Sequence, residues 1–209
     1  MKVQLLVDNP NSWMLPYAQN INDELNKSNI NCSLILSNDK VEQGDILILL
    51  SCEKIFRDYS KNKHNLVIHE SNLPQGKGWS PMTWQILEGK NNVTITIFEA
   101  DDKIDSGEIY FQENVVLTGL ELIDEIREKQ AKVTYSLIKK FISAYPDIKS
   151  EHQEGEESYY KKRTPEDSRL DIDKTIDQQF NLLRIVDNDR YPAYFVKNGT
   201  KYKIKIFKA

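Results

Sequence analysis

Short runs of leucine, isoleucine and valine alternate with polar or helix-like stretches along the first third of the chain. A segment between the first two runs, Pro16–Lys27, carries apolar residues at helical spacing. Strands and helices in alternation are typical of an α/β fold built on a mostly parallel sheet. The predicted strands of this part are Val3–Val7, Ser33–Leu36, Ile46–Leu50 and Leu66–Ile68.

The middle of the chain continues the α/β pattern and then changes character. A short helix is predicted over Pro81–Leu87, and the longest helical pattern spans Gly119–Tyr145, where Pro146 ends it. Between these helices, alternation of apolar and polar residues predicts strands. The predicted strand and strand pieces are Val93–Phe98, Glu108–Phe111 and Val115–Val116.

The last sixty residues predict a small unit of their own. Lys149–Lys162 is charged and nearly free of aliphatic residues, which indicates a mobile connection. A helix is expected over Ile176–Val186, and Asn198-Gly199 favours a hairpin turn between Tyr194–Val196 and Tyr202–Phe207. We therefore predict a main domain over residues 1–148, and a linker with a small α+β extension over residues 149–209 that packs on it.

Composition narrows the choice of partners and compartment. The chain has 28 Lys and Arg against 32 Asp and Glu, a net charge of −4, so nothing attracts it to nucleic acid or to an anionic membrane. No apolar run approaches the ~20 residues of a membrane span, and Met1–Asp8 is expected to be a strand rather than a signal peptide. Cys32 and Cys52 form no metal-binding motif and indicate buried thiols in a reducing, cytoplasmic setting.

One histidine stands where α/β folds place their ligands. His69 ends a predicted strand and leads into a proline- and glycine-containing loop, which puts it at the carboxyl edge of the sheet. A neutral imidazole there can accept a proton from an amine as the amine attacks a carbonyl carbon. Asp105 could orient the ring or help to manage the proton. The alternative for such a pair is a structural histidine with an unrelated aspartate in a turn.

The sequence around these two residues resembles the folate-dependent formyltransferases, which include methionyl-tRNA formyltransferase and bacterial sugar N-formyltransferases. The resemblance rests on His69–Pro81, on the 36-residue step to Asp105, and on the run Ile104–Ile109. It spans roughly residues 45 to 205 and implies a Rossmann-like catalytic domain. Three downstream segments resemble the tail that follows the catalytic domain in the tRNA and sugar enzymes: Tyr160–Asp171, Phe180–Arg184 and Tyr191–Phe195.

This resemblance implies transfer of a formyl group from N10-formyltetrahydrofolate to an amine, without a metal. His69 would be the base and Asp105 its partner. The loop Ser51–Glu53 would hold the pterin through its backbone, and Glu99–Asp102 would line the other side of that pocket. The implied cofactor-binding residues are Ser51, Cys52, Glu53, Glu99, Ala100, Asp101 and Asp102.

The sequence departs from the family at one catalytic position. The family usually carries Asn-X-His, whose asparagine donates a hydrogen bond to the oxyanion of the tetrahedral intermediate, but Val67 stands two residues before His69. Losing one such donor costs on the order of 3 kcal/mol of transition-state stabilisation. Asn65 lies too far along the strand, about 13 Å from His69. The candidate replacements are Asn9, Asn11, Asn72 and a backbone N–H.

The amine acceptor is expected to be a small molecule. The tRNA enzyme of the family has a basic carboxyl-terminal domain, whereas this chain ends earlier and is acidic. The resemblance therefore favours a nucleoside diphosphate-linked amino sugar, with a 4-amino-4,6-dideoxyhexose first, destined for a surface polysaccharide such as lipopolysaccharide. The alternatives are another small amine and, because of Val67, a catalytically silent nucleotide-sugar or folate binder.

Aromatic and basic residues near the predicted ligand edge are candidates for contacts with this acceptor. For each of them, ordinary packing, a plain turn or a solvated charge is the competing interpretation. Either the final strand or the Gly119–Tyr145 helix could form a homodimer contact, although both could be covered within one chain. The candidate substrate-binding residues are Asn9, Asn11, Trp13, Lys77, Trp79 and Arg163.

Overall fold

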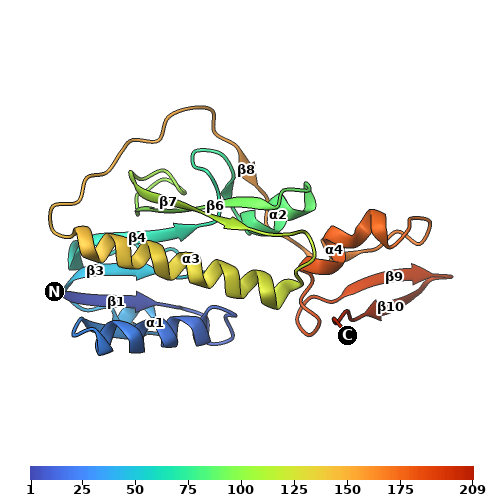
Figure 1. Cartoon of the computed structure of the whole chain (residues 1–209), viewed down its shortest axis with the longest axis horizontal. Helices are drawn as coiled ribbons and strands as arrows, with labels where there is room; N and C mark the ends of the chain where they lie inside the picture. Colours follow the sequence, from blue (N-terminus) through green and yellow to red (C-terminus); the bar gives the residue numbers. More distant parts are fainter.

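A six-stranded sheet forms the centre of the computed structural model, which describes residues 1–209. Its strand order is β2-β1-β3-β4-β6-β7 (Figure 1), with β1 to β4 parallel and β6 and β7 antiparallel to their neighbours. The predicted α/β architecture with a mostly parallel sheet is confirmed. The strands of this sheet are β1 (Lys2–Leu6), β2 (Asn31–Ile35), β3 (Gly44–Leu49), β4 (Asn62–His69), β6 (Asn92–Glu99) and β7 (Ile109–Val116).

Helices α1 (Leu15–Lys27) and α3 (Ile123–Ala144) cover one face of the sheet, and α2 (Pro81–Leu87) follows the β4 loop. Apolar residues of α1 and α3 share one core cluster with strand residues that include Leu66 and Ile68 of β4. Because side chains alternate along a strand, Val67 points to the opposite face, where it packs against a smaller cluster. That cluster is Leu6, Val41, Leu47, Leu49 and Phe56.

Two predicted elements of the middle region differ in extent. The strand pieces at residues 108–111 and 115–116 form the single strand β7, because β7 is an edge strand whose polar residues can face solvent without interrupting the ladder. Helix α3 begins at Ile123 rather than near Gly119, since the carboxylates of Glu121 and Glu125 accept hydrogen bonds from the backbone just before it.

Residues 149–162, predicted as a mobile connection, instead follow a defined path. We call this segment the strap; it arches over the molecule, drawn in orange in Figure 1, before reaching the loop after β4. Glu151 exchanges two backbone hydrogen bonds of 2.8 Å with Ile109, and β8 (Tyr159–Tyr160) pairs with β5 (Lys77–Gly78). These bonds are mostly between backbone groups, so the apolar pattern of the sequence carries no sign of them.

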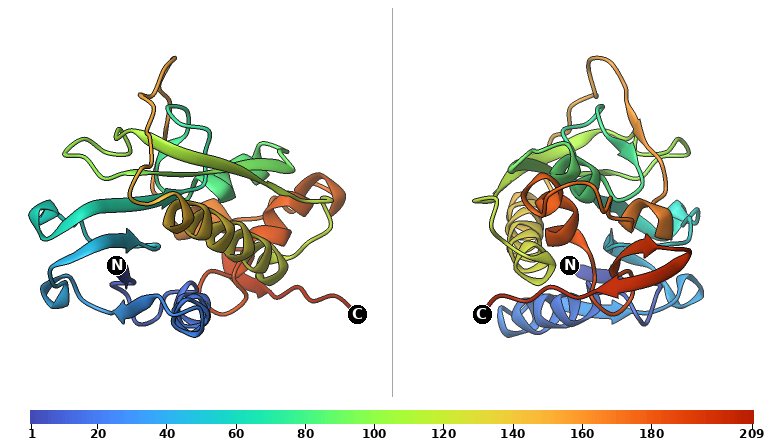
Figure 2. Two further views of the ribbon diagram at one scale, coloured as in Figure 1. Left: turned by 60° about the vertical axis from the view of Figure 1, so that its left-hand side comes forward. Right: turned by 90° about the vertical axis from the view of Figure 1, so that its right-hand side faces the viewer.

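The carboxyl-terminal extension contains a short helix and the predicted hairpin. The expected helix over residues 176–186 is split, because Ile176 is 73% exposed and contributes no core contact. The hairpin lies at the opposite end of the molecule from the amino terminus (Figure 1), and the chain ends in an extended tail after it (Figure 2). The elements here are α4 (Phe180–Ile185), β9 (Ala193–Lys197) and β10 (Thr200–Ile204).

Single 3-10 turns complete the structure at η1 (Asn38–Lys40), η2 (Tyr59–Lys61), η3 (Pro165–Ser168) and η4 (Asp177–Gln179). None of the helices combines the length and the apolar character needed to cross a membrane.

Candidate active site

The structure brings His69 and Asp105 together from different parts of the chain. His69 is the last residue of β4, and Asp105 lies in the loop between β6 and β7. Nε2 of His69 is 3.8 Å from Oδ2 of Asp105, and the two side chains are only 8% and 15% exposed. A largely buried imidazole beside a carboxylate can receive a proton, because the carboxylate stabilises the imidazolium that results.

The hydrogen bond of His69 determines which ring nitrogen is free. Nε2 lies 2.8 Å from the carbonyl oxygen of Gly76. A carbonyl oxygen only accepts, so Nε2 carries the hydrogen and Nδ1 carries the lone pair in this arrangement. Nε2 therefore faces Gly76 and Asp105, and Nδ1 is the ring nitrogen that can accept a proton.

Two other parts of the chain hold Asp105 in place. Its backbone has a positive φ of 48°, and its Oδ2 accepts a 2.8 Å hydrogen bond from the N–H of Gly78 in the His69 loop. The side-chain amide of Gln153, on the strap, donates to the carbonyl oxygens of Asp105 and Gly107 at 2.9 Å each. The strap therefore fixes the backbone of the Asp105 loop, and sequence reasoning missed it because the segment lacks apolar residues.

Gly107 allows the Asp105 loop to lie against β6. A Cβ at this position would fall 1.7 Å from the backbone carbonyl oxygen of Glu99, which cannot move without breaking the strand. We expect Gly107→Ala to lower the free energy of unfolding by about 3 kcal/mol, because overpacking against backbone forces the loop away. Thermal or urea unfolding followed by circular dichroism would measure this change.

Gly199→Ala is the matched control, since its added Cβ meets nothing within 4 Å and only the positive φ of 77° opposes it. This control is expected to cost about 1 kcal/mol. Equal stability losses in the two variants would contradict the close approach of the Asp105 loop to β6.

The predicted cofactor loop and the Ala100 segment lie on the same face of the sheet as Val67. Cys52, Val67 and Ala100 all pack against the smaller core cluster. The loop is anchored by Asp8, whose carboxylate accepts from the backbone N–H of Glu53 at 2.8 Å and of Lys54 at 2.7 Å. Burial raises the pKa of the Cys52 thiol to about 12, so this cysteine stays neutral.

The carboxylate of Glu99 is engaged within the protein. It accepts hydrogen bonds from the backbone N–H of Asn65 at 2.5 Å and from the hydroxyl of Tyr110 at 2.8 Å, and it lies 3.2 Å from His64 Nδ1. Asp101 and Asp102 are exposed in the following loop, where Asp101 accepts from Tyr59 through its carbonyl oxygen. No pattern in the sequence indicated the contacts of Glu99 with His64 and Tyr110.

The two basic substrate candidates make internal contacts. Lys77 is 1% exposed, and its Nζ donates to Glu157 at 2.7 Å and to Ser106 at 2.8 Å. Arg163 donates to the carbonyl oxygen of Asp167 and to the hydroxyl of Ser168. Burial lowers the pKa of Arg163, against the opposing effect of Asp167. The Lys77 side chain thus connects Glu157 of the strap to Ser106 of the Asp105 loop.

The two tryptophan candidates differ in accessibility. Trp79 is 42% exposed, with Nζ of Lys162 4.5 Å from its ring centroid, next to the Gly78 that bonds Asp105. Trp13 instead packs against Tyr17, at 5.9 Å between centroids, and under the guanidinium of Arg127. The exposed indole of Trp79 is the better placed of the two to stack on a ligand.

None of the asparagines proposed as replacement oxyanion donors is hydrogen-bonded to His69. The side-chain amide of Asn9 donates to Glu53 at 2.6 Å. Asn65, which the sequence already excluded, donates its side-chain amide to the carbonyl oxygen of Tyr59 at 3.0 Å. Asn11 and Asn72 are exposed. Val67 shares the strand face of His69, and no side-chain amide is hydrogen-bonded to the ring.

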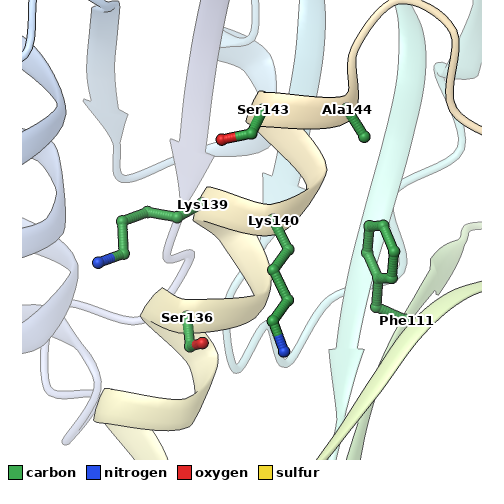
Figure 3. Close-up of a pocket in the computed structure, with 6 residues that line it drawn as sticks. All are labelled: Phe111, Ser136, Lys139, Lys140, Ser143 and Ala144. Atoms are coloured by element: carbon green, nitrogen blue, oxygen red, sulfur yellow. The ribbon is translucent and has the colours of Figure 1, made fainter.

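Two surface hollows lie outside the His69–Asp105 pair. One, of about 480 Å³, lies between β7 and the end of α3, with both lysines and both serines on the helix (Figure 3). The second, of about 190 Å³, belongs to the carboxyl-terminal extension. No group of three or more His, Cys, Asp or Glu side chains is arranged to hold a metal ion. The first hollow is lined by Phe111, Ser136, Lys139, Lys140, Ser143 and Ala144.

Comparison with known sequences finds one family and many relatives. A family model described as formyl transferase matches residues 35–142. A curated methionyl-tRNA formyltransferase from Lactobacillus acidophilus is 29% identical over 140 residues, which make up 66% of this chain and 44% of that protein. The matched segment thus spans less than half the length of this relative.

Comparison with solved structures finds the same fold throughout the chain. A methionyl-tRNA formyltransferase from Clostridium thermocellum superposes with a TM-score of 0.83 at 21% identity, covering 99% of this chain and 92% of that one. A sugar N-formyltransferase from Shewanella gives 0.73 at 18%, covering 99% and 97%. HypX from Aquifex aeolicus, solved with tetrahydrofolic acid, gives 0.81 at 17%, covering 99% and 37%. At these identities the likeness establishes the fold alone.

Proposed function

Because this chain belongs to the formyl transferase family, we propose that it moves a formyl group from N10-formyltetrahydrofolate to an amine. The observation that carries the proposal is the His69–Asp105 pair, 3.8 Å apart on a chain of this family. Residues 1–148 would carry the catalytic machinery, and residues 149–209 would fix its loops and contribute to acceptor binding. The folate-bound Aquifex structure of the same fold supports the choice of donor.

The proposed mechanism is direct attack of the amine on the formyl carbon. As the new C–N bond forms, His69 accepts a proton from the amine, and Asp105 stabilises the imidazolium. Collapse of the tetrahedral intermediate breaks the bond between the formyl carbon and N10. His69 then returns the proton to N10, so the products are the N-formylated amine and tetrahydrofolate.

The folate would bind on the sheet face that carries Val67. The Ser51–Glu53 loop and the Glu99–Asp102 segment flank this face, and their members Cys52 and Ala100 pack on the same cluster. The backbone of these segments would recognise the pterin, because the Glu99 carboxylate is already satisfied by Asn65 and Tyr110. The Asp8 carboxylate, which holds the backbone of Glu53 and Lys54, would keep this loop in position.

For the acceptor, we propose the amino group of a nucleoside diphosphate-linked amino-deoxy sugar, with a 4-amino-4,6-dideoxyhexose first, as used for surface polysaccharides. The Shewanella sugar enzyme supports this choice, since the likeness covers nearly all of both chains. Trp79, exposed beside the Asp105 anchor, would stack on the acceptor. Initiator tRNA is the second candidate acceptor. The Clostridium methionyl-tRNA formyltransferase favours it, because the likeness covers 92% of that enzyme.

The decisive experiment is to mix the protein with N10-formyltetrahydrofolate and a panel of amino-sugar nucleotides, and to follow the release of tetrahydrofolate. Turnover of a nucleotide sugar but not of methionyl-tRNA is the expected result. Turnover of methionyl-tRNA alone would contradict the proposed sugar acceptor but would support formyl transfer. Binding without turnover across both substrate classes would contradict the transfer reaction itself and favour a silent binder.

Val67→Asn is expected to raise the turnover number at least about tenfold. An asparagine two residues before His69 would lie on the same strand face and supply an oxyanion donor, each of which contributes about 10²–10³ in rate. Steady-state kinetics with the preferred acceptor would measure the change. Val67→Ala, which alters packing without adding a donor, should show no gain. An unchanged rate in Val67→Asn would mean that another group already supplies this hydrogen bond.

A further inference from the structure

The end of the chain carries a charge opposite to that of the rest. Residues 190–209 contain six lysines and arginines and no aspartate or glutamate, while the whole chain has a net charge of −4. The preceding 189 residues therefore hold 22 cations against 32 carboxylates, a net charge of −10. Cations concentrated in one short segment of an acidic protein indicate a local preference for an anion.

Internal ion pairs neutralise only part of this segment. Lys205 pairs with Asp189 at 2.7 Å, and Lys208 pairs with Glu125 at 2.6 Å. Arg190, Lys201 and Lys203 have no carboxylate within 4.0 Å. Lys201 and Lys203 alternate along β10 and so project from the same face, which leaves them free for a ligand.

These three unpaired cations surround one hollow. It has a volume of about 190 Å³ and lies between η3 and the β9–β10 hairpin. No carboxylate lines it, and the hydroxyl of Ser168, at 2% exposure, supplies a buried polar group. Nζ of Lys201 lies 3.6 Å from the centroid of the Tyr194 ring, which also lines the hollow. The lining is Pro165, Ser168, Arg190, Tyr191, Pro192, Tyr194, Lys201 and Lys203.

The hollow is connected to the catalytic region at two points. The guanidinium of Arg190 donates to the carbonyl oxygen of Asn11, in the loop after β1. On the other side, the hydroxyl of Ser168 accepts a hydrogen bond from Arg163. Arg163 follows Tyr160 by three residues, and the carbonyl oxygen of Tyr160 accepts a hydrogen bond from the backbone N–H of Trp79. The lining of the hollow is thus linked to the loop after β1 and to the segment paired with Trp79, which follows the Gly78 that bonds Asp105.

We propose that this hollow binds the diphosphate of the acceptor, with Arg190, Lys201 and Lys203 as its cationic contacts. Charge-assisted hydrogen bonds to phosphate are the strong contacts that such side chains make. A compact anion suits the site, because three cations without a carboxylate partner line one small hollow, while residues 1–189 carry a net charge of −10. The identity of the acceptor rests on the proposed function, but the binding of a diphosphate does not.

The test is isothermal titration calorimetry of the full chain with inorganic pyrophosphate and with uridine diphosphate. The variant is Lys201→Gln with Lys203→Gln, and the matched control is Lys205→Gln with Lys208→Gln, which removes the same charge from the same segment. We expect the first pair to weaken binding of both probes at least about tenfold and the control pair to change it less than about twofold. Circular dichroism would verify that both variants are folded.

Three results would overturn the proposal: no binding of either probe to the unmodified protein, equal weakening in the two pairs, or no weakening in the first pair. Binding of an RNA hairpin that is much tighter than that of uridine diphosphate, falls steeply with salt and is lost in the first pair would assign the cations to nucleic acid and also overturn it. Because these titrations require no turnover, failure of formyl transfer leaves their outcome unaffected.

Discussion

Replacing His69 with glutamine is expected to lower the rate of formyl transfer by about 10²–10⁴-fold, the contribution of a positioned general base. Glutamine can still donate to the carbonyl oxygen of Gly76, as Nε2 of the histidine does at 2.8 Å. It has no nitrogen that accepts a proton from the amine. The loss should therefore appear in the turnover number, measured by tetrahydrofolate release, with the binding of folate nearly unchanged.

His152→Gln provides the matched control, because this histidine lies on the strap with a side chain 86% exposed and should leave the rate unchanged. Asp105→Asn is expected to show a smaller loss than His69→Gln, since the amide can keep the loop in place but cannot stabilise the imidazolium electrostatically. A His69→Gln variant that retains full turnover would remove His69 from the mechanism.

The sequence predicted the sheet and its flanking helices because burial leaves a periodic record. Most residues of β1, β3 and β6 are buried, so these strands appear in the sequence as short runs rich in apolar residues. The limits of α2 were predicted as observed, since Pro81 begins the helix and Gly89, with a φ of 89°, follows its end. Elements held by apolar packing could therefore be predicted from the sequence.

The contacts of the strap could not be predicted from the sequence, because they are not made by apolar packing. Gln153 and Ser158 act through hydrogen bonds to backbone groups of loops far away in the chain. Such bonds require a particular backbone geometry and leave no periodic pattern. The same holds for the burial of Lys77, because a lysine with a carboxylate partner 80 residues away resembles any surface lysine in sequence.

His69 and Asp105 could be paired from sequence only through the motif around them. The strand before His69 determined its place at the sheet edge, but Asp105 lies in a loop four residues before the polar edge strand β7 and carries no pattern of its own. The structure adds what the motif lacks: the Gly78 N–H, the Gln153 amide and the close approach at Gly107 that together place the carboxylate.

Replacing Arg184 with methionine is expected to lower the free energy of unfolding by about 3–5 kcal/mol, the cost of breaking a buried ion pair on one side. The Arg184 side chain is fully buried, and its Nη2 lies 3.3 Å from Oε2 of Glu121. Its Nε donates to the carbonyl oxygen of Glu121 at 3.1 Å, and Nη1 donates to Asn91 at 2.8 Å. These contacts join the carboxyl-terminal extension to the start of α3, so urea unfolding at pH 7 should measure the loss.

The dependence on pH separates this ion pair from simple loss of packing. Burial opposes ionisation of Glu121, but Lys129 and the backbone N–H of Thr118 outweigh it and lower the pKa of Glu121 from 4.5 to about 2. A depressed carboxyl pKa contributes stability above the unfolded value and loses it as the pH falls toward the folded value. The deficit of Arg184→Met should thus be full above pH 4.5 and shrink below it.

Two further variants test the same pair. Lys129→Met removes the other, 38% exposed cation of Glu121 and should cost only about 1 kcal/mol, because solvent screens that pair. Adding Glu121→Leu to Arg184→Met should recover much of the loss, since no unpaired charge then stays buried. If the double variant lost as much stability as Glu121→Leu and Arg184→Met lose together, then packing, rather than the buried charge, would hold residues 149–209 against the start of α3.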